Sequence, residues 1–227
     1  MLEQRFVGWH VRTERPCFDA SVVDLMDFQP CVERGRTAFL YVLPFSATEA
    51  LVEATFLDDP ALPSANAEAM LQQHMDQLSR SEYEVLYREK AALPMGEQAK
   101  REPSRGRIVE IGTRGGRVKA SSGYAFLRIQ RQSAALADAL RQGMDLPRRF
   151  ESRSYSVLDG IFLRAIKRFP GRAPSYFMAM FRQLPPETLV RFLSETASPG
   201  EVLRVMLALP KLDFAQAALL PGVQLTL

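Results

Sequence analysis

The sequence predicts an α+β protein in which a mainly antiparallel sheet comes first and helices follow. Two observations support this order. Runs rich in β-forming residues, separated by turn residues, occupy the first 57 positions, and amphipathic segments broken at prolines occupy the part after residue 154. The 47% hydrophobic and 24% charged content excludes an intrinsically disordered chain, because it supplies enough apolar residues for one large core or two small ones.

Four strands are predicted in the first part, over residues 5–12, 22–29, 37–44 and 49–56. Pro16, Pro30 and Gly35 fall in the connections, so an antiparallel meander is the simplest topology. In the first strand, alternation places Gly8 and His10 on one face of the sheet.

A helix is predicted over residues 64–79, with Ser64 as its N-cap and Ala67, Leu71 and Met75 on one face. The next segment, YEVLYREKAAL at 83–93, is predicted as a strand, with a helix as the alternative.

The polar segment GEQAKREPSRG at 96–106 is the best candidate boundary. We therefore expect a mainly antiparallel β region with one helix (1–95), a flexible connection (96–106), a strand-turn-helix region (107–153) and a C-terminal helical region (154–227). The third region would contain a strand at 107–111 and a helix from about Gly123 to Leu140. The last would contain helices at 154–169, 174–183, 186–194, 199–209 and 212–219.

Charge is divided unevenly along the chain. Residues 1–100 hold 9 Lys and Arg against 16 Asp and Glu, whereas residues 101–227 hold 20 against 10. The basic half is compatible with amphipathic helices whose Arg side chains cover apolar surface, or with a face that rests on an anionic membrane. Nucleic acid is not expected as a partner, because no DNA- or RNA-binding motif accompanies the charge.

Several kinds of site lose support from the sequence. Cys17 and Cys31 have no neighbours at metal-ligand spacing, so no metal site is expected. There is no apolar run long enough to cross a membrane, and the first residues do not resemble a signal peptide. The absence of a Ser/His/Asp order, an HExxH motif and a P-loop disfavours hydrolases, metalloproteases and nucleotide hydrolases.

Three residues are candidates for acid chemistry. Glu53 interrupts an apolar strand, so it either points to solvent at a sheet edge or faces a pocket that raises its pKa. Asp27, in LMDF, presents the same alternatives. His10 is either a hydrogen-bonded structural residue or a proton donor. The other histidine, His74, is predicted to lie on the surface of its helix.

The segment GTRGGRVKASSGY at 112–124 precedes a helix. On its own it is compatible with a plain strand-turn-helix connection, or with backbone N–H groups that bind a phosphate or the electron-rich edge of a flavin.

Taken together, several segments resemble the bacterial flavin-dependent lycopene β-cyclase family. They are QRFVGWHVRT (4–13), LMDF (25–28), FLYVLPFSATEALVEATF (39–56), YEVLYREKAALPM (83–95), GTRGGRVKASSGYAFLRIQRQ (112–132), FLRAIKRFPGRAP (162–174), LPPETLVRFLS (184–194) and ALPKL (208–212). The resemblance implies that the sheet is the substrate-side domain of a Rossmann-type flavoprotein. It also implies a non-redox cyclisation of the ψ-end groups of lycopene to β-ionone rings, in the presence of reduced FAD.

The resemblance also implies roles for particular residues. Glu53 and Asp27 match acidic positions of the family, and His10 stands where some relatives have a catalytic Glu. The flavin would be contacted by residues of the glycine-rich segment, with Ala120 and Ser122 in place of the usual Pro and Thr. These cofactor-binding candidates are Gly112, Gly115, Gly116, Ser121, Ser122, Gly123 and Tyr124.

The sequence departs from the family in one respect, because no GxGxxG pyrophosphate-binding turn precedes Gln4. The chain is therefore expected to be a fragment, to receive its FAD-binding half from a separate polypeptide, or to be an inactive remnant. The expected substrate is lycopene or a related linear carotenoid, and the expected location is the cytoplasmic face of the cell membrane, as a peripheral protein.

The alternative functions are another flavin-dependent isoprenoid enzyme, such as a geranylgeranyl reductase or a monooxygenase, and a non-catalytic module that binds a membrane surface.

Overall fold

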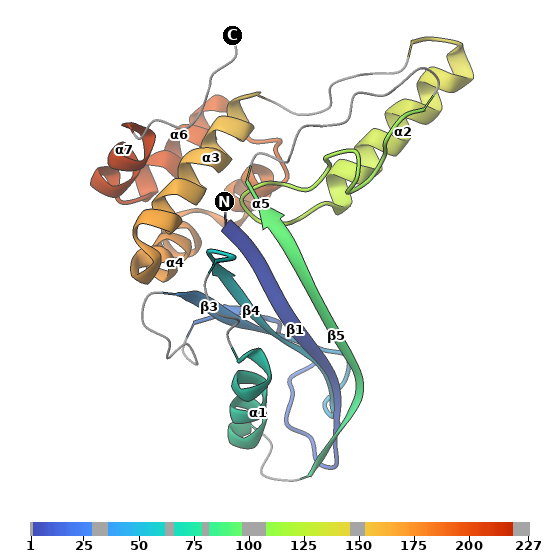
Figure 1. The fold of residues 1–227 in the computed structure, drawn as a ribbon, viewed down its shortest axis with the longest axis vertical. Coiled ribbons are helices and arrows are strands. Elements are labelled where there is room, and N and C mark those ends of the chain that lie inside the picture. Colours follow the sequence, from blue (N-terminus) through green and yellow to red (C-terminus); the bar gives the residue numbers. More distant parts are fainter. Residues whose placement is uncertain are drawn as a thin grey trace. The chain divides into compact units, whose positions relative to one another are not determined.

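The structure is a computed structural model of the 227-residue chain. It describes residues 2–28, 36–61, 66–78, 82–96, 108–145 and 153–219. The chain forms two compact units, Met1–Leu93 and Pro94–Leu227. The first unit holds the sheet and one helix, and the second holds the remaining helices, so the predicted order of sheet and helices is confirmed (Figure 1).

The sheet has five strands in the order β2-β3-β4-β1-β5. The strands are β1 (Leu2–Thr13), β2 (Asp24–Asp27), β3 (Thr37–Pro44), β4 (Glu49–Asp58) and β5 (Tyr83–Met95). Strands β2, β3 and β4 form an antiparallel meander, but β1 pairs with β4 and not with β2, so the simple meander was wrong. The pairing of β1 with β4 sets Trp9 beside Val52 and Val11 beside Ala50, which joins their apolar side chains into one buried face.

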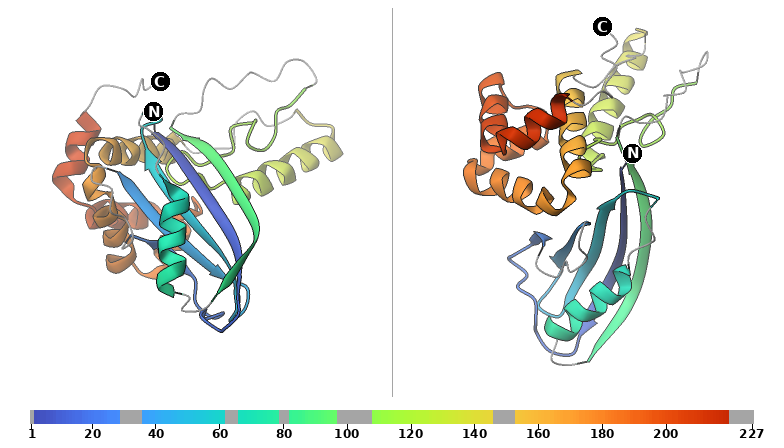
Figure 2. Two further views of the ribbon diagram at one scale, coloured as in Figure 1. Left: turned by 60° about the horizontal axis from the view of Figure 1, so that its bottom comes forward. Right: turned by 60° about the vertical axis from the view of Figure 1, so that its left-hand side comes forward.

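Helix α1 (Ala67–Leu78) covers one face of this sheet, as Figure 2 shows. Its predicted apolar stripe is buried, with Leu71 and Met75 fully covered in the core. The helix begins where the Asn66 side chain accepts a hydrogen bond from the backbone N–H of Ala69 at 3.0 Å. The predicted cap, Ser64, lies outside the described residues.

The second unit begins with a looped segment and helix α2 (Phe126–Gln142). No strand forms over the described part of the predicted strand, residues 108–111, and Arg107 lies outside the described residues. The Gln132 side chain explains the difference, because its amide donates to Glu110 O at 3.3 Å and accepts from the N–H of Gly112 at 3.2 Å. The segment is thus hydrogen-bonded to a helix and not to a neighbouring strand.

The helical part of this unit follows the proline-broken pattern of the sequence. Its helices are α3 (Arg153–Arg168), α4 (Ala173–Gln183), α5 (Pro186–Leu193), α6 (Pro199–Ala208) and α7 (Lys211–Leu219), with a 3₁₀ turn at Pro170–Arg172 between α3 and α4. Tyr176 of α4 is fully buried, and its hydroxyl donates to Asp213 of α7 at 2.7 Å. The predicted connection at 96–106 lies outside the described residues except for Gly96.

Within the described residues, no helix is long and apolar enough to cross a membrane.

Candidate functional site

The sheet face opposite α1 carries the first candidate site. Side chains alternate along each strand, so Val52 and Ala54 of β4 face the core while Glu53 faces the other way. The antiparallel register places Glu53 directly between Gly8 of β1 and Tyr41 of β3. These three residues therefore form one row across the centre of the sheet, on the face that α1 does not cover.

Glu53 is half-buried in this row. Thr55, on the same strand and the same face, donates its hydroxyl to Glu53 Oε1 at 2.6 Å. Burial raises the pKa of Glu53; the hydrogen bond from Thr55 acts to lower it, and the charge of Glu89 raises it further. The net upward shift means that this carboxyl keeps a proton at a higher pH than an exposed glutamate does, which is the property of a general acid.

Gly8 and Glu89 complete the surroundings of Glu53. The Glu89 side chain of β5 lies over the backbone of Gly8, because a Cβ built on Gly8 would come within 2.8 Å of Glu89 Oε1 and 2.9 Å of Glu89 Cγ. Only a glycine leaves this space free. Sequence reasoning missed Glu89, because it stands in the charged run REK, where a solvated carboxylate is the usual interpretation.

Aromatic side chains adjoin the carboxyl row. Burial, followed by the charge of Glu53, raises the pKa of Tyr41 to about 12, so its phenol is neutral at physiological pH. The rings of Tyr41 and Phe39 meet edge to face, with centroids 5.2 Å apart, and Phe28 meets Phe39 in the same way at 5.6 Å. Electron-rich ring faces can stabilise a nearby cation.

His10 lies on the same face as Glu53, one row further along the sheet, where it pairs with Leu51. Its Nε2 is 2.7 Å from Glu49 Oε1, and its ring meets Phe45 edge to face with centroids 5.1 Å apart. The structure thus brings His10 and Glu53 onto one face, and His10 already has a carboxylate partner there.

Asp27 lies on the opposite face of the sheet. It pairs with Leu40, whose side chain is fully buried in the core beneath α1, and its charge acts on His74 of that helix. The register of β2 is irregular between Asp24 and Asp27, and Met26 between them has a φ of 59°. The structure therefore does not bring Asp27 together with Glu53 and His10.

The sequence predicted His74 on the surface of its helix, but in the structure it is only partly exposed. Its Nε2 is buried without a hydrogen-bond partner among the described residues. Burial lowers the pKa of His74, against the opposing charges of Asp27 and Asp24.

The glycine-rich segment forms two tight turns before α2. Gly112 and Gly116 have φ values of 62° and 75°, and a Cβ on Gly115 would lie 2.4 Å from Glu110 O. The N–H groups of this turn are used within the chain, since Gly115 donates to Ile111 O and Gly116 to Thr113 O.

The second turn contains Ser121, Ser122, Gly123 and Tyr124. The N–H groups of Ser122 and Gly123 both donate to Lys119 O, and the N–H of Tyr124 donates to Ser122 Oγ at 3.3 Å. Ser121 donates its hydroxyl to Asp159 Oδ1 of α3 at 2.7 Å. The seven candidate positions are thus brought into two consecutive turns.

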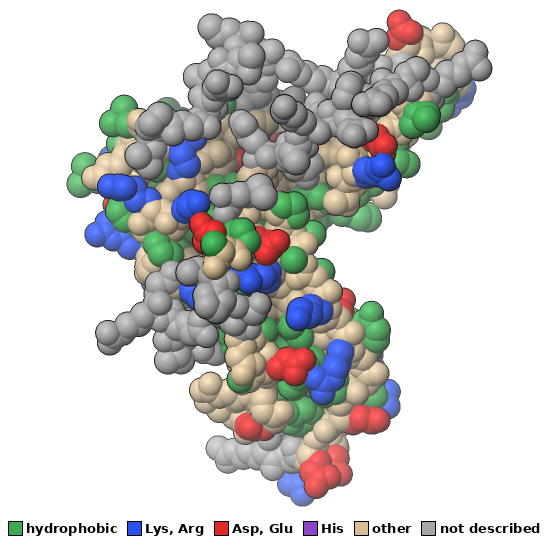
Figure 3. All heavy atoms as spheres, in the orientation of Figure 1, with side chains coloured by type: hydrophobic (Ala, Val, Ile, Leu, Met, Phe, Trp, Pro, Cys, Tyr) green, Lys and Arg blue, Asp and Glu red, His purple; other side chains and the backbone are tan. Residues whose placement is uncertain are grey.

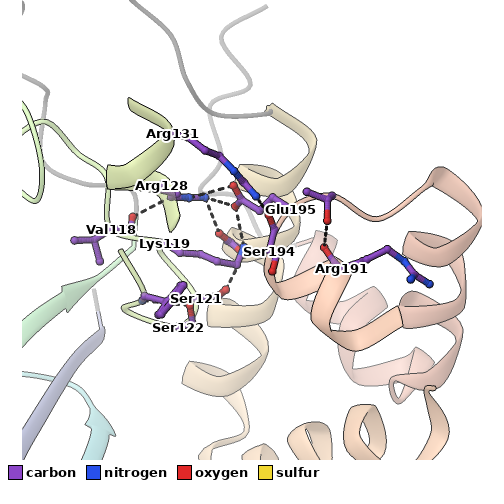
Figure 4. Close-up of polar contacts among 12 residues, drawn as sticks. Val118, Lys119, Ser121, Ser122, Arg128, Arg131, Arg191, Ser194 and Glu195 are labelled. Carbon is purple, nitrogen blue, oxygen red and sulfur yellow. Dashed lines mark hydrogen bonds and ion pairs between the residues drawn. The ribbon is translucent and has the colours of Figure 1, made fainter. Parts of the chain in front are cut away.

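A buried ionic cluster fixes these turns to the helices (Figure 4). Lys119 Nζ lies 2.7 Å from Asp159 Oδ1 and 3.2 Å from Glu195 Oε1. Arg128 of α2 also pairs with Glu195, and it donates to Val118 O at 3.1 Å. Burial alone would raise the pKa of Glu195, but the hydrogen bond from Arg128 and the charges of Lys119 and Arg128 outweigh it and lower that pKa.

Sequence reasoning missed this cluster. The four charged side chains come from four separate segments, and no spacing in the sequence links them. Their burial among apolar helices is a property of the tertiary structure alone.

In the glycine-rich segment and the helix that follows it, the part that fits a flavin is the start of α2. Five backbone N–H groups of these turns already have acceptors in the chain, so they are not free to bind an anion. They belong to Gly112, Gly115, Gly116, Ser122 and Gly123. Ala125, at the N-cap of α2, provides no side-chain cap, so the first turn of this helix is the part suited to a negative or electron-rich group.

The second unit also contains an apolar pocket of about 350 Å³. Its polar lining residues include Lys119, Ser121 and Asp159, so one candidate cofactor residue lies at its wall. The apolar lining comes from five helices and includes Leu158, Phe162, Met180, Phe192, Leu203, Met206, Leu207 and Phe214. The volume lies at the lower end of the range for ligand pockets, roughly 300–1,000 Å³.

No group of three or more His, Cys, Asp or Glu side chains within the described part of the chain is arranged to hold a metal ion.

Comparison with known proteins gives three findings. The sequence model of one family, described as "Lycopene cyclase protein", matches residues 1–219. No curated protein gives a significant sequence match. Among solved structures, the chain is similar to a geranylgeranyl bacteriochlorophyll reductase-like protein from Thermoplasma acidophilum, with a TM-score of 0.48 and 9% identity. That similarity covers 94% of this chain and 54% of the other, so the chain spans about half of that protein's length.

Proposed function

The chain belongs to the lycopene cyclase family, and from this premise we propose that it closes the ψ-end groups of lycopene to β-ionone rings, by acid catalysis and without net redox change. The observation that carries this proposal is the half-buried carboxyl of Glu53 on the sheet face opposite α1, with a pKa raised by burial. An apolar polyene offers no polar group to activate, so its cyclisation needs a carboxyl that still holds its proton and is positioned against the terminal double bond.

The reaction would begin with transfer of the Glu53 proton to the terminal C=C bond of the substrate. The neighbouring double bond then supplies its electron pair to close a six-membered ring, and loss of a ring proton forms the new C=C bond. Tyr41 and Phe39 adjoin Glu53 on this side of the sheet, and their rings are suited to stabilising the carbocation.

Reduced FAD is the proposed cofactor, and when bound it supplies negative charge near the carbocation. The first turn of α2 is the part of this chain that would contact it, with Ser121–Tyr124 holding that turn in place. The 227 residues contain no GxGxxG turn. We therefore propose that the pyrophosphate and ribose contacts come from an FAD-binding half outside these 227 residues.

A peripheral position on the inner face of the cell membrane is proposed for the assembled enzyme. Leu203, Met206 and Leu207 of α6 are each at least half exposed, and the exposed side chains of Arg204 and Lys211 adjoin them. Hydrophobic and basic side chains also lie side by side on the visible surface of the helical unit in Figure 3. Such a surface binds anionic lipid, in which lycopene is dissolved.

Flotation with anionic and neutral liposomes tests the membrane proposal. We expect the protein to float with the anionic vesicles at low salt and to be released at high salt. Protein that stays at the bottom with both kinds of vesicle would contradict it.

The reaction is tested by expression in lycopene-accumulating cells, with and without an FAD-binding half. We expect conversion of red lycopene to a cyclised carotenoid of unchanged mass when both parts are present. Unchanged lycopene in both strains would overturn the cyclase proposal. A product of altered mass that requires NAD(P)H would indicate a reductase or a monooxygenase in its place.

A further inference from the structure

We propose that Glu89 is the partner of Glu53 in a carboxyl pair that holds one shared proton, and that Gly8 exists at its position to let the two carboxyl groups meet. The pairing stands on the geometry of the sheet. Only its use in catalysis rests on the proposed cyclisation.

The geometry begins with the strand register. Glu53 lies directly opposite Gly8 in the antiparallel β1–β4 pair, so a side chain at position 8 would rise from the same face, beside that of Glu53. The Glu89 carboxyl occupies this place, since its Oε1 lies 2.8 Å and its Cδ 3.3 Å from the position of a Gly8 Cβ. Directly opposed Cβ atoms in such a pair lie about 4.5–5.5 Å apart, so the Glu89 carboxyl and the Glu53 side chain are neighbours on this face. Burial, and to a smaller extent the charge of Glu89, raises the pKa of Glu53.

The charges around the pair do not neutralise it. From β3, the group facing Glu53 is the neutral phenol of Tyr41, and from β4 it is the Thr55 hydroxyl. From β1, the nearest titratable side chain on this face is His10, which is engaged with Glu49. Among the described residues, neither Glu53 nor Glu89 forms an ion pair with Lys or Arg.

Two carboxylates without a cation in a half-buried site each raise the free energy of the other's ionised form, so the pair binds its first proton more tightly than an isolated carboxylate does. The hydrogen bond from Thr55 occupies Glu53 Oε1, so the other carboxyl oxygen of Glu53 is available to hold a proton. The Glu89 carboxyl lies beside Gly8. Glu89 acts through Glu53 and is therefore a positioning residue: a negative charge on Glu89 favours the protonated form of Glu53.

In the proposed reaction, the carboxyl pair gives one proton to the substrate and takes one back. Breaking the Glu53 O–H bond forms a C–H bond on the substrate, and the leaving ring proton later returns to the Glu53 carboxylate. The pair ends each turnover with the same single proton, so no oxidant, reductant or external base is consumed.

The test is NMR titration of the full 227-residue chain labelled with ¹³C at the glutamate carboxyl carbons, with Glu53 assigned by its loss in Glu53→Gln. We expect Glu89→Gln to move the Glu53 midpoint to lower pH, because a like charge is removed. Gly8→Ala should move it in the same direction, because the methyl group displaces Glu89. Glu84→Gln, which changes an exposed glutamate on the same strand, should leave the midpoint where it is.

A Glu53 midpoint that does not change in a folded Glu89→Gln variant would overturn the pairing. Because Gly8→Ala could disturb the sheet, Glu89→Gln is the deciding variant, and its circular dichroism spectrum shows whether it is folded. No substrate or flavin is present in this titration. Failure of the pairing is thus distinguishable from failure of the cyclase proposal, which only the cell assay addresses.

Discussion

The hydroxyl of Thr55 donates to Glu53 Oε1 at 2.6 Å, and both side chains rise from the same strand on the sheet face that α1 leaves open. This bond leaves the second carboxyl oxygen of Glu53 available to hold a proton. Glu53 is thus fixed in orientation by Thr55, and its burial makes it costly to ionise. Substitutions can test the two properties separately.

Glu53→Gln should abolish catalysis and stabilise the fold. Glutamine keeps an oxygen acceptor for Thr55 but has no acidic proton, so we expect cyclisation to fall by about 100-fold or more in the two-part cell assay. Thermal unfolding of the isolated variant at pH 7 should occur at a higher temperature than that of the wild type, because glutamine has no ionisable group whose burial costs free energy above pH 4.5. Asp19→Asn, an exposed substitution outside the strands, serves as the control and should change neither quantity. A fully active Glu53→Gln variant would contradict the role of Glu53 as the acid.

The pH dependence of Glu53 follows from its raised pKa. The folded state binds its proton more tightly than the unfolded state, so the associated stability is fully present below the ordinary value of 4.5 and is lost as the pH rises through the folded pKa. Urea unfolding across this range should show a smaller loss with rising pH for Glu53→Gln than for the wild type. Identical slopes in the two proteins would show that Glu53 titrates normally.

His74 should make the sheet unit sensitive to mild acid. Burial lowers its pKa, so the unfolded state takes up a proton first, and stability is lost as the pH falls below 6.5. His74→Leu replaces the unpartnered imidazole by an apolar side chain beside Leu71 and Met75. We expect the variant to lose less stability than the wild type between pH 7.5 and pH 5.5, as measured by urea unfolding. Equal losses in both proteins would contradict the prediction.

Lys119→Met should destabilise the helical unit strongly. It leaves Asp159 and Glu195 buried with only Arg128 to balance two negative charges. Breaking a buried ion pair from one side costs about 3–5 kcal/mol. Arg141→Ala, which removes the exposed pair with Asp138, is the matched control and should cost less than about 1 kcal/mol. Similar unfolding free energies for the two variants would show that the cluster contributes little.

Two Gly→Ala substitutions in the second unit should have opposite effects. Gly115→Ala places a methyl group 2.4 Å from Glu110 O, so the turn must open and the melting temperature should fall. Gly200→Ala lies in the first turn of α6, with no atom within 4 Å of the new methyl group, and should stabilise the protein by up to about 1 kcal/mol. Differential scanning calorimetry of both variants checks the sign of each effect. A Gly115→Ala variant as stable as the wild type would show that the turn is not held closed by this contact.

The sequence pattern predicted most of the local structure. Alternation and helical periodicity placed β3 at its observed residues and the five C-terminal helices within one or two residues of their bounds. The neighbours of β1 could not be predicted in this way, because turn residues indicate only how consecutive strands connect, and β1 pairs with β4 through contacts of Trp9 and Val11.

The candidate site was predictable only where a residue breaks its local pattern. Glu53 could be found because a carboxylate interrupts an apolar strand. Glu89 could not, since its importance depends on the missing side chain of Gly8, on a different strand. The same holds for Lys119 and Asp159, which are ordinary charged residues in the sequence and become a buried pair only in the folded unit.

The place of β1 between β4 and β5 has a consequence for how the protein folds. The meander β2-β3-β4 can form from neighbouring segments, but β1 must wait for β4, since Arg12 pairs with Glu49 and Glu3 with Asp58. Strand β5 comes later still in the chain and lies beyond β1 in the sheet. Such non-local pairing slows folding and leaves β1 without its partner until β4 has been synthesised. The row that contains Glu53 and Gly8 therefore cannot be assembled before β4 has been synthesised, although both residues belong to strands of one sheet.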